Sequence, residues 1–369
     1  MIGVYIHIPY CRTICPYCDF VKRPTKGAVP AEFIRALTTE IASFDGPREA
    51  DTVFFGGGTP SLIAPRDLET VLHAVRDRFS LTSDCELTLE ANPDDITGDL
   101  VRAWIDLGVN RVSLGVQSFN EDALRYLGRR HDADGARRAC AIVKSHFQNW
   151  NIDLIFGVPP YDAWTATLEE TARMNSPHVS AYGLTYEAGT PFGKRADEAI
   201  DEDLYLEQYS ATQSLLHHVA RYEVSNYAKP GHESVHNLHY WRNEEYAGFG
   251  PGAYAFVNDV RARNHVKLED YLEAPGEKIE ALALSEDEVR IETVIQHLRL
   301  REGISRASYA RRFDRTLDRD FGEILRSLIE RGLLHDDGET VRPTNQGFDL
   351  NNEIGLALVQ VPASHPDTN

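Results

Sequence analysis

Three cysteines lie within eight residues in the stretch Tyr5-Ile6-His7-Ile8-Pro9-Tyr10-Cys11-Arg12-Thr13-Ile14-Cys15-Pro16-Tyr17-Cys18-Asp19-Phe20. Because they are separated by three and by two residues, their thiolates can converge on one metal centre. A closed structural zinc site needs four ligands, and the sequence shows no fourth cysteine or spaced histidine pair nearby. Three thiolates suit a four-iron cluster whose fourth iron stays open to a small molecule. A zinc loop completed by a distant histidine is the alternative.

A β-branched run at residues 4–8 precedes the cysteines and begins a regular alternation of strands and helices. Further strands are expected at 52–55, 86–90, 111–116, 151–156 and 179–185. Helices are expected at 30–44, 65–79, 97–107, 121–147 (with an interruption), 164–174 and 202–219. This pattern predicts an α/β fold of six parallel βαβ units. Six units are too few for a closed eight-unit barrel. We therefore expect either a partial (β/α)6 barrel or a doubly wound sheet, with the chemistry at the carboxyl ends of the strands.

The alternation stops after about Tyr222, and residues 226–256 are rich in aromatic residues, glycine and histidine. Helices are expected at 285–300, capped by Ser285, at 305–313, and at 321–331, ended by Gly332. A hairpin around Asp336-Asp337-Gly338 follows, so this part resembles a winged-helix module. We predict a core domain at 1–228, an aromatic connecting segment at 229–283, a small winged-helix-like α+β domain at 284–361 and a polar tail at 362–369.

The composition, with 42% hydrophobic and 26% charged residues, is that of an ordinary globular protein. A net charge of −19 repels phosphate backbones and disfavours nucleic acid as a partner. Cys85 and Cys140 stand alone, so the five cysteines indicate a reduced chain rather than a disulfide framework. No apolar run approaches the roughly 20 residues of a membrane span, and no targeting segment is evident. The sequence predicts a cytoplasmic protein.

Glycine or polar motifs also lie at the predicted second to fifth strands. The run Gly56-Gly57-Gly58-Thr59-Pro60 lets the backbone approach a ligand closely, and the absence of a following Lys-Ser or Lys-Thr excludes a P-loop. Glu90 and Gln117 end the next two strands, and Asp153 lies inside an otherwise apolar strand, where an ionised carboxylate is costly unless bonded. Each alone is more often a structural hydrogen-bonding residue. Together, at one edge of a sheet, they predict a ligand site.

The cysteine spacing followed by Gly56-Gly57-Gly58-Thr59-Pro60 resembles the radical S-adenosylmethionine superfamily. The longer motif from Tyr5 to Cys11 narrows the resemblance to oxygen-independent coproporphyrinogen III dehydrogenase and the HemW-type heme chaperones. It implies that Cys11, Cys15 and Cys18 bind a [4Fe-4S] cluster whose fourth iron is chelated by S-adenosylmethionine. Reductive cleavage of that cofactor can then give a 5′-deoxyadenosyl radical.

The resemblance also implies roles for side chains around the cofactor. Gly57, Gly58 and Thr59 would contact its methionine part, and Tyr17 would pack near its adenine. Other cofactor-binding residues implied are Tyr5, Glu90, Gln117, Arg129 and Asp153. Arg130 is an adjacent residue that could be confused with Arg129.

The segment His236-Asn237-Leu238-His239-Tyr240-Trp241 raises the question of a second ligand. A histidine among aromatic residues is more often structural. The match to a His-Asn-x-x-Tyr-Trp segment of the same branch favours a functional role. Because a heme pocket needs an axial nitrogen and apolar walls, His236 is the first candidate heme ligand and His239 the second.

Two departures separate the branches. The dehydrogenases carry a fourth cysteine where this chain has Phe20, and a long extension before the motif, whereas here Tyr5 is almost the first residue. The resemblance therefore implies a heme chaperone without dehydrogenase activity. Its partners would be an electron donor for the cluster and a heme acceptor such as a respiratory membrane protein. The alternative is the dehydrogenase itself, which decarboxylates coproporphyrinogen III. A DNA-binding regulator is a third interpretation, disfavoured because residues 321–331 offer only Arg326 and Arg331 as cations.

Overall fold

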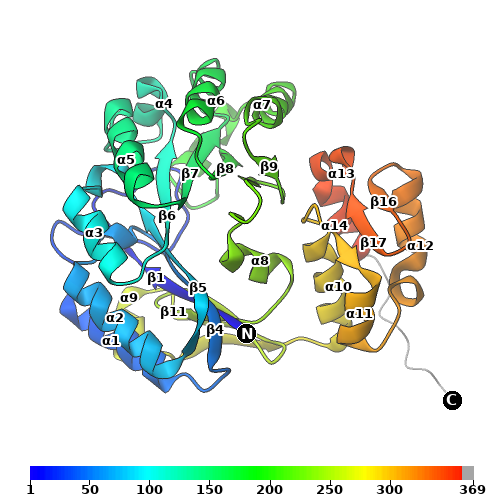
Figure 1. The fold of residues 1–369 in the computed structure, drawn as a ribbon, viewed down its shortest axis with the longest axis horizontal. Helices are drawn as coiled ribbons and strands as arrows, with labels where there is room; N and C mark the ends of the chain where they lie inside the picture. The colour runs from blue at the N-terminus through cyan, green and yellow to red at the C-terminus, as the bar shows by residue number, and fades with distance from the viewer. Residues whose placement is uncertain (360–369) are drawn as a thin grey trace.

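The computed structural model describes residues 1–359. The end of the predicted C-terminal domain, 360–361, and the predicted tail, 362–369, lie outside the described residues. Figure 1 shows a large unit built on one curved sheet and, beside it, a smaller C-terminal unit. Within residues 1–359, none of the helices combines the length and the apolar character that crossing a bilayer requires.

The large unit contains a twelve-stranded sheet whose seven central strands run parallel. In spatial order these are β11 (Tyr246–Phe249), β1 (Ile2–Ile8), β4 (Glu49–Gly57), β5 (Ser80–Ala91), β6 (Arg111–Gln117), β7 (Asn149–Phe156) and β8 (His178–Gly183). The antiparallel strands at one edge are β12 (Tyr254–Val257), β13 (Val260–Asn264) and β14 (Lys278–Ala283). Those at the other edge are β10 (Asn226–Ala228) and β9 (Ala220–Arg221).

Seven helices follow the parallel strands and cover the outer face of the curved sheet (Figure 1). They are α1 (Ala31–Ser43), α2 (Pro65–Arg78), α3 (Gly98–Asp106), α4 (Glu121–Tyr126), α5 (Ala133–His146), α6 (Ala163–Met174) and α7 (Glu202–Leu215). Their inward residues, such as Phe33, Leu37 and Leu72, join the strands in one buried core. The predicted interruption in 121–147 is confirmed between α4 and α5, where Asp132 caps α5 by accepting the Gly135 amide at 2.6 Å.

The order of the strands in the sheet distinguishes a partial barrel from a doubly wound sheet. The predicted strands β1, β4, β5, β6, β7 and β8 are neighbours in chain order, whereas a doubly wound sheet reverses its order partway. The fold is therefore the partial barrel, and β11 adds a seventh parallel strand on the other side of β1. Because these strands are parallel, their carboxyl ends meet at one edge of the sheet.

Residues 229–283, expected as an aromatic connecting segment, supply β11 to β14 of the main sheet. They also form α8 (Val235–Trp241) and α9 (Leu268–Glu273). The buried carboxylate of Glu40 on α1 holds this part in place. It accepts hydrogen bonds from the Gly250 amide at 2.8 Å, the Asn264 amide group at 2.6 Å and the Tyr271 hydroxyl at 2.9 Å.

The C-terminal unit is an α+β arrangement with a small three-stranded sheet. Its elements are α10 (Glu286–His297), β15 (Ile304–Ser305), α11 (Arg306–Phe313), α12 (Leu317–Glu330), β16 (Leu334–Asp336), β17 (Thr340–Pro343), α13 (Asn345–Asp349) and α14 (Asn351–Val359). Ser285 caps α10 in a capping box, and the predicted hairpin is present. The prediction that the third helix starts at Phe321 was wrong. It starts at Leu317, because Thr316 caps it by accepting the Arg319 amide.

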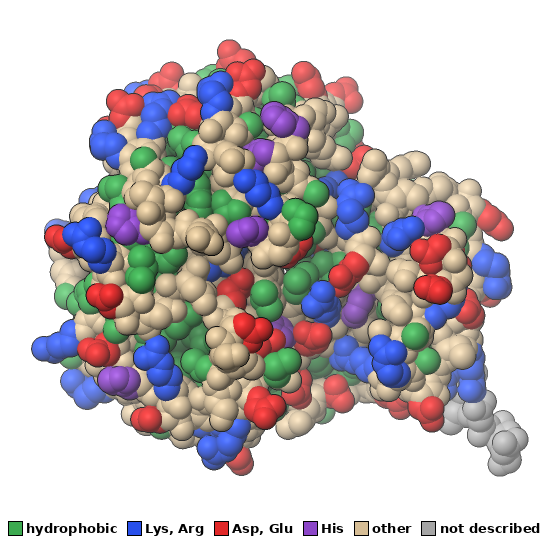
Figure 2. Space-filling view, viewed as in Figure 1, with side chains coloured by type: hydrophobic (Ala, Val, Ile, Leu, Met, Phe, Trp, Pro, Cys, Tyr) green, Lys and Arg blue, Asp and Glu red, His purple; other side chains and the backbone are tan. Residues whose placement is uncertain are grey.

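Aromatic and cationic side chains join the two units. The Arg221 guanidinium lies 4.8 Å from the centre of the Tyr209 ring and 4.4 Å from that of Phe348, which belongs to the C-terminal unit. Arg299 lies 4.6 Å from the ring of Trp241 on α8. Such contacts between a cation and a ring stabilise a junction modestly. Acidic and basic side chains are interspersed over most of the face in Figure 2.

Candidate cofactor site at the carboxyl ends of the strands

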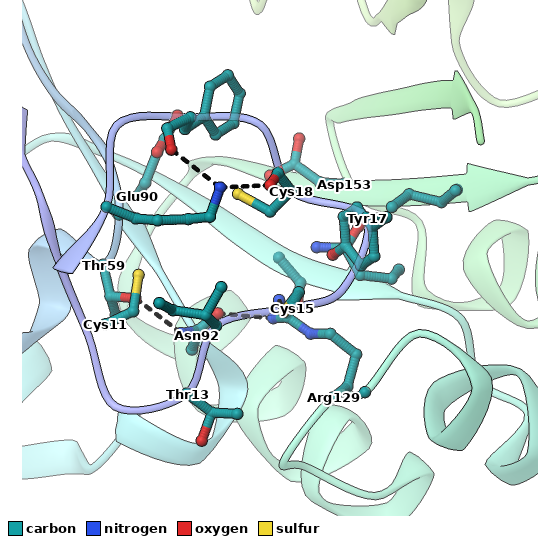
Figure 3. Close-up of a pocket in the computed structure, with 18 of the residues that line it drawn as sticks. Cys11, Thr13, Cys15, Tyr17, Cys18, Thr59, Glu90, Asn92, Arg129 and Asp153 are labelled. Atoms are coloured by element: carbon teal, nitrogen blue, oxygen red, sulfur yellow. Dashed lines mark hydrogen bonds between the residues drawn. The ribbon is translucent and has the colours of Figure 1, made fainter. Parts of the chain in front are cut away.

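A cavity of about 370 Å³ opens at the carboxyl ends of the parallel strands (Figure 3). Most of the predicted site residues line it, although they come from distant parts of the chain. Those are Cys11, Cys15, Tyr17, Cys18, Gly57, Gly58, Thr59, Glu90, Gln117, Arg129 and Asp153. Tyr5 and His236 do not line this cavity; they line a second one described below.

All three clustered cysteines border this cavity from one loop. Cys11 ends the two-residue strand β2 (Tyr10–Cys11), which pairs with β3 (Arg23–Pro24) at the base of the loop. The Cys18 amide donates to the Cys15 carbonyl at 3.2 Å, and this bond closes a tight turn. Burial raises the pKa values of the Cys11 and Cys18 thiols, although a hydrogen bond with Thr59 favours the Cys11 thiolate. Metal binding here therefore requires the release of thiol protons.

No three His, Cys, Asp or Glu side chains of residues 1–359 are arranged so that they could hold one metal ion. The three thiols are thus spread around the cavity. In an iron–sulfur cluster each thiolate binds a different iron, so the thiols do not have to meet at one point.

Neighbouring segments fix the cysteine loop over the cavity. The Phe192 amide, which follows β8, donates to the Pro16 carbonyl at 3.0 Å. The ring of Phe192 lies 6.3 Å from that of Tyr17, so the partly buried Tyr17 side chain packs against the segment after β8. Gly128 has a positive φ of 67°, and a Cβ there would lie 2.8 Å from the Pro16 side chain. Any larger residue would push the loop outward.

Arg129 and Arg130 have different environments. Arg129 is half-buried and donates to the Asn92 side-chain oxygen at 2.6 Å, to the Gly115 carbonyl at 2.7 Å and to the Cys15 sulfur at 3.5 Å. Arg130 is partly exposed and its nearest carboxylate oxygen, on Asp94, is 3.4 Å away. Arg129 is therefore the arginine directed at the cysteine loop (Figure 3).

The glycine run is required by packing within the protein. Gly57 has a φ of +107°, and a Cβ there would lie 2.3 Å from the His7 ring. A Cβ on Gly58 would lie 2.7 Å from the Ile8 carbonyl oxygen. The glycine backbone, which the sequence predicted to approach a ligand closely, therefore also lies close to β1. It leaves the Gly57 amide free to donate to the Glu90 carboxylate at 3.0 Å.

Glu90 and Asp153 are two half-buried carboxyl groups that border the cavity. Burial raises the pKa of Glu90 to about 8, and the charge of Asp153 adds to this shift. Burial also raises the pKa of Asp153, while hydrogen bonds from Ser113 at 2.8 Å and Asn151 at 2.7 Å favour its ionised form. Carboxyl groups with displaced pKa values in a cavity are typical of ligand sites.

Gln117 ends β6 in the left-handed region, with a φ of 67°. A non-glycine residue in this conformation is uncommon and costs energy, and such residues concentrate at functional sites. The side chain is buried and lies against Gly115, where a Cβ would be 3.0 Å from the Gln117 amide nitrogen. The strand end is thus shaped to hold this side chain at the cavity wall.

Asn92 is the main residue of the site that was not assigned from the sequence. Its side-chain nitrogen donates to the Thr59 hydroxyl at 3.2 Å, and its oxygen accepts from Arg129. It therefore links the end of β4 to the arginine beside Cys15 (Figure 3). The position directly after Glu90-Ala91 and before Pro93 is the only signal in the sequence.

A second cavity of about 200 Å³ lies in the barrel interior and holds Tyr5 and His236. The Tyr5 hydroxyl is 3.0 Å from His7 Nδ1. Both ring nitrogens of His236 have partners: Nδ1 is 2.8 Å from the Thr52 hydroxyl and Nε2 is 2.9 Å from the Tyr240 hydroxyl. Burial lowers the pKa of His236 to about 3, so the ring is neutral. Iron coordination by His236 stays a prediction, and it requires the exchange of one of these bonds.

His239, unlike His236, lies between two carboxylates that favour its protonated form. Its Nε2 lies 2.8 Å from Asp51 and its Nδ1 lies 2.9 Å from Glu244. Burial alone would lower the pKa of His239, but the two carboxylates raise it to about 9. A protonated imidazole donates through both nitrogens and has no lone pair for iron.

A pH titration can check this protonation. Because the folded state raises the pKa of His239 from 6.5 to about 9, its stabilising contribution is complete below pH 6.5 and is lost as the pH rises through 9. We expect the difference in free energy of unfolding between the wild type and His239→Gln to shrink across that window. Urea unfolding at a series of pH values measures it. A difference that stays constant from pH 6 to pH 9.5 would contradict the assignment.

Comparison with known families agrees with this geometry. Residues 5–173 match the model of the radical SAM superfamily, and residues 284–350 match the HemN C-terminal domain. The fold, the cysteine loop and the cavity at the strand ends therefore define a radical S-adenosylmethionine protein.

Within that superfamily the chain belongs to the HemW-type heme chaperone family. It is 34% identical to the heme chaperone HemW of Lactococcus lactis over 366 residues, covering 95% of this chain and 96% of the relative. It is 32% identical to HemW of Bacillus subtilis (96% and 98% covered) and 40% identical to HemW of Escherichia coli over 266 residues (69% and 70% covered). Coproporphyrinogen III oxidase (HemN) of Escherichia coli, described as a radical SAM enzyme, has the same fold, with a TM-score of 0.84 and 22% identity over 97% of this chain and 90% of its own.

Membership in the superfamily implies a [4Fe-4S] cluster and S-adenosylmethionine, and the residues present fit both. Three thiols from one loop border the cavity, and thiolates are the ligands that iron–sulfur clusters take. Arg129 Nε is buried and has no hydrogen-bond partner in residues 1–359, so the site has an unused donor. A sulfonium nucleotide supplies acceptor groups for such a donor, and its cleavage would supply an organic radical.

Proposed function

We propose that the protein is a heme chaperone, which binds a [4Fe-4S] cluster, S-adenosylmethionine and heme and transfers the heme to an acceptor protein. The observation that carries this proposal is the near full-length similarity to HemW heme chaperones, combined with three cysteines bordering one cavity. An electron donor would serve the cluster. The acceptor would be a heme protein such as a respiratory membrane protein, and transfer would occur in the cytoplasm.

The residues of the large cavity have distinct roles in this proposal. Cys11, Cys15 and Cys18 hold the cluster, and Arg129 positions the loop at Cys15. The backbone of Gly57 and Gly58, with Thr59, receives the methionine part of the cofactor. Glu90, Gln117, Asp153 and Tyr17 complete the contacts, and Tyr5 supports the site from the neighbouring cavity.

Phe20 favours the chaperone over the dehydrogenase. It borders the cavity two residues after Cys18, where the dehydrogenases carry a fourth cysteine, and its side chain is 61% exposed. A phenyl ring cannot ligate iron. It presents an apolar surface at the mouth, which suits contact with a flat apolar ligand or with a partner protein.

The experiment that tests the proposal begins with anaerobic reconstitution of the full chain with iron and sulfide. Heme is then titrated and followed by absorbance, and coproporphyrinogen III is offered in parallel with S-adenosylmethionine and a reductant. A Soret band without a decarboxylated product supports the chaperone. Turnover to protoporphyrinogen supports the dehydrogenase, and absence of heme binding rejects the chaperone.

His236→Ala tests the predicted heme ligand. If His236 coordinates the iron, the dissociation constant for heme rises at least about tenfold, which corresponds to about 1.4 kcal/mol. Replacement of His73, an exposed histidine on α2, by Ala is the matched control and leaves the titration unchanged. Thermal unfolding of both variants shows whether the fold is retained. An unchanged heme affinity in folded His236→Ala would remove His236 from the site.

A further inference from the structure

The second cavity contains a buried arginine, one of whose donors has no hydrogen-bond partner in the part of the chain that the structure describes. Arg111 lies at the start of β6, is 2% exposed, and borders the 200 Å³ cavity. Its neighbour Val112 is buried in the core on the other face of the strand, so Arg111 and Ser113 face the barrel interior. Within residues 1–359 its Nε has no hydrogen-bond partner, and the nearest carboxylate oxygen, on Glu86, is 3.8 Å away.

Glu86 is itself engaged elsewhere. Its two oxygens accept the backbone amides of Val235 and His236 at 3.2 and 3.1 Å, at the first turn of α8. At 3.8 Å it offsets part of the charge of Arg111 but does not take up the guanidinium's donors. A guanidinium stays charged in proteins, and burying it without partners is costly.

Several other polar groups of the cavity hydrogen-bond to one another. The Asn151 side-chain nitrogen lies 2.7 Å from Ser113 Oγ and 2.9 Å from Ser180 Oγ, and its oxygen is 2.7 Å from His178 Nδ1. His178 Nε2 is 2.9 Å from the Tyr222 hydroxyl. Arg111 takes no part in this network. Buried polar groups in native proteins are almost always bonded, and a ligand that enters the cavity can supply the partner that Arg111 lacks.

The second cavity adjoins the cofactor cavity. Glu90, Ser113, Asp153 and Tyr182 border both. A ligand group bound at Arg111 would therefore lie next to the contents of the large cavity. At about 200 Å³ the space is below the range of pockets that enclose whole drug-sized ligands, so it takes a small molecule or a side arm of a larger one.

We propose that this cavity is a carboxylate-binding site in which Arg111 makes a paired, planar hydrogen-bonded contact with the two carboxylate oxygens. A guanidinium and a carboxylate match in shape and charge, and a bidentate pair of this kind is among the strong hydrogen-bonding arrangements. The site goes beyond the proposed heme transfer and does not depend on which residue ligates the heme iron. The carboxylate is either a propionate arm of the tetrapyrrole or a small free acid.

Acetate is the direct probe, with acetamide as its neutral counterpart. Binding of ¹³C-labelled acetate to the full chain is followed by NMR in the wild type and in Arg111→Gln. Arg78→Gln is the matched control, because Arg78 is a buried arginine on α2 that donates to the Phe44 and Gly46 carbonyls away from the cavity. We expect acetate to bind the wild type and Arg78→Gln, and to bind Arg111→Gln at least about tenfold more weakly. Acetamide should bind none of them.

Heme and heme dimethyl ester then identify the source of the carboxylate. If a propionate occupies the site, Arg111→Gln weakens heme binding but leaves binding of the ester unchanged. If the occupant is a free acid, both porphyrins bind the two proteins equally and acetate still distinguishes them. The proposal is overturned if the wild type does not bind acetate and also binds heme no more tightly than heme dimethyl ester. If the protein binds acetate but no porphyrin, the heme-chaperone proposal is rejected and the carboxylate-site proposal stands.

If Arg111→Gln fails to fold, Arg111→Lys takes its place. Lysine keeps the charge but cannot form the planar pair of hydrogen bonds, so we expect the same weakening of acetate binding.

Discussion

Replacing Cys15 by alanine is expected to leave the reconstituted protein without its iron–sulfur cluster. Cys15 is one of the three thiols that border the cavity within residues 1–359, and its sulfur accepts a hydrogen bond from the Arg129 guanidinium at 3.5 Å. A cluster held by two thiolates loses a third of its protein ligands, and metal binding by such sites depends on every ligand. We expect near-complete loss of bound iron and sulfide and of the visible absorbance of the cluster. S-adenosylmethionine binding through the open iron is lost with it.

Cys85→Ala provides the control for this change. Cys85 is partly exposed on β5 and does not border the cavity, so its removal should leave the iron and sulfide content unchanged. Metal and sulfide analysis of both variants, together with unfolding curves, separates cluster loss from misfolding. Wild-type iron content in folded Cys15→Ala, or zinc in place of iron and sulfide in the wild type, would contradict the cluster assignment.

Six of the seven central parallel strands, all except β11, could be predicted because each is a short apolar run with its own end signal. Ile6 and Ile8 in β1, or Val53 and Phe55 in β4, are buried on one face of a parallel strand whose ends are marked by Pro9 or glycine. No partner has to be known to recognise such runs.

The strands β11 to β14 could not be recognised in the same way. The chain around β11 is broken by Gly248, Gly250 and Gly252, and its pairing with β1 and β12 makes it a strand. Every residue of β14 is exposed, so it carries no hydrophobic alternation. A distant carboxylate, that of Glu40, adds to the strand pairings of this part, and its partners there are more than 200 residues away in the sequence.

The same distinction applies to the site. The cysteine loop and the glycine run are local motifs, and they border the predicted cavity. Asn92 and Arg111 act through contacts across the barrel, which no spacing in the sequence reveals. Tyr5 lines the second cavity and not the cofactor cavity, because its side chain points from β1 toward His236. The centres of these two rings are 6.3 Å apart.

Replacing Gly57 by alanine is expected to destabilise the fold by about 3 kcal/mol or more, because two separate costs add. The backbone there has a φ of +107°, which L-residues with a side chain rarely adopt. The new Cβ would also lie 2.3 Å from the His7 ring. That ring cannot move away easily, since its Nε2 is 2.8 Å from the Val21 carbonyl and its Nδ1 is 3.0 Å from the Tyr5 hydroxyl.

Two other glycines separate these costs. Gly231 also has a positive φ, +80°, but a Cβ there meets nothing within 4 Å, so Gly231→Ala measures backbone strain alone, about 1–2 kcal/mol. Gly27 has neither feature, and Gly27→Ala should change stability by less than about 0.5 kcal/mol. Urea unfolding with a common slope gives the three values. If Gly57→Ala costs no more than Gly231→Ala, then the packing of the glycine run against β1 does not constrain the site.

The glycine variants also test whether the run serves the cofactor. Relief of the clash with His7 would move the Gly57 amide away from Glu90, to which it donates at 3.0 Å. The Gly57 amide and the Glu90 carboxyl group, which both border the cofactor cavity, would then no longer be held in their present positions. S-adenosylmethionine binding by the reconstituted protein should therefore fall in Gly57→Ala at temperatures where it is still fully folded. Gly231→Ala, destabilised by backbone strain alone, should bind the cofactor as the wild type does. Equal cofactor affinity in all three variants would mean that the run is needed only to build the strand.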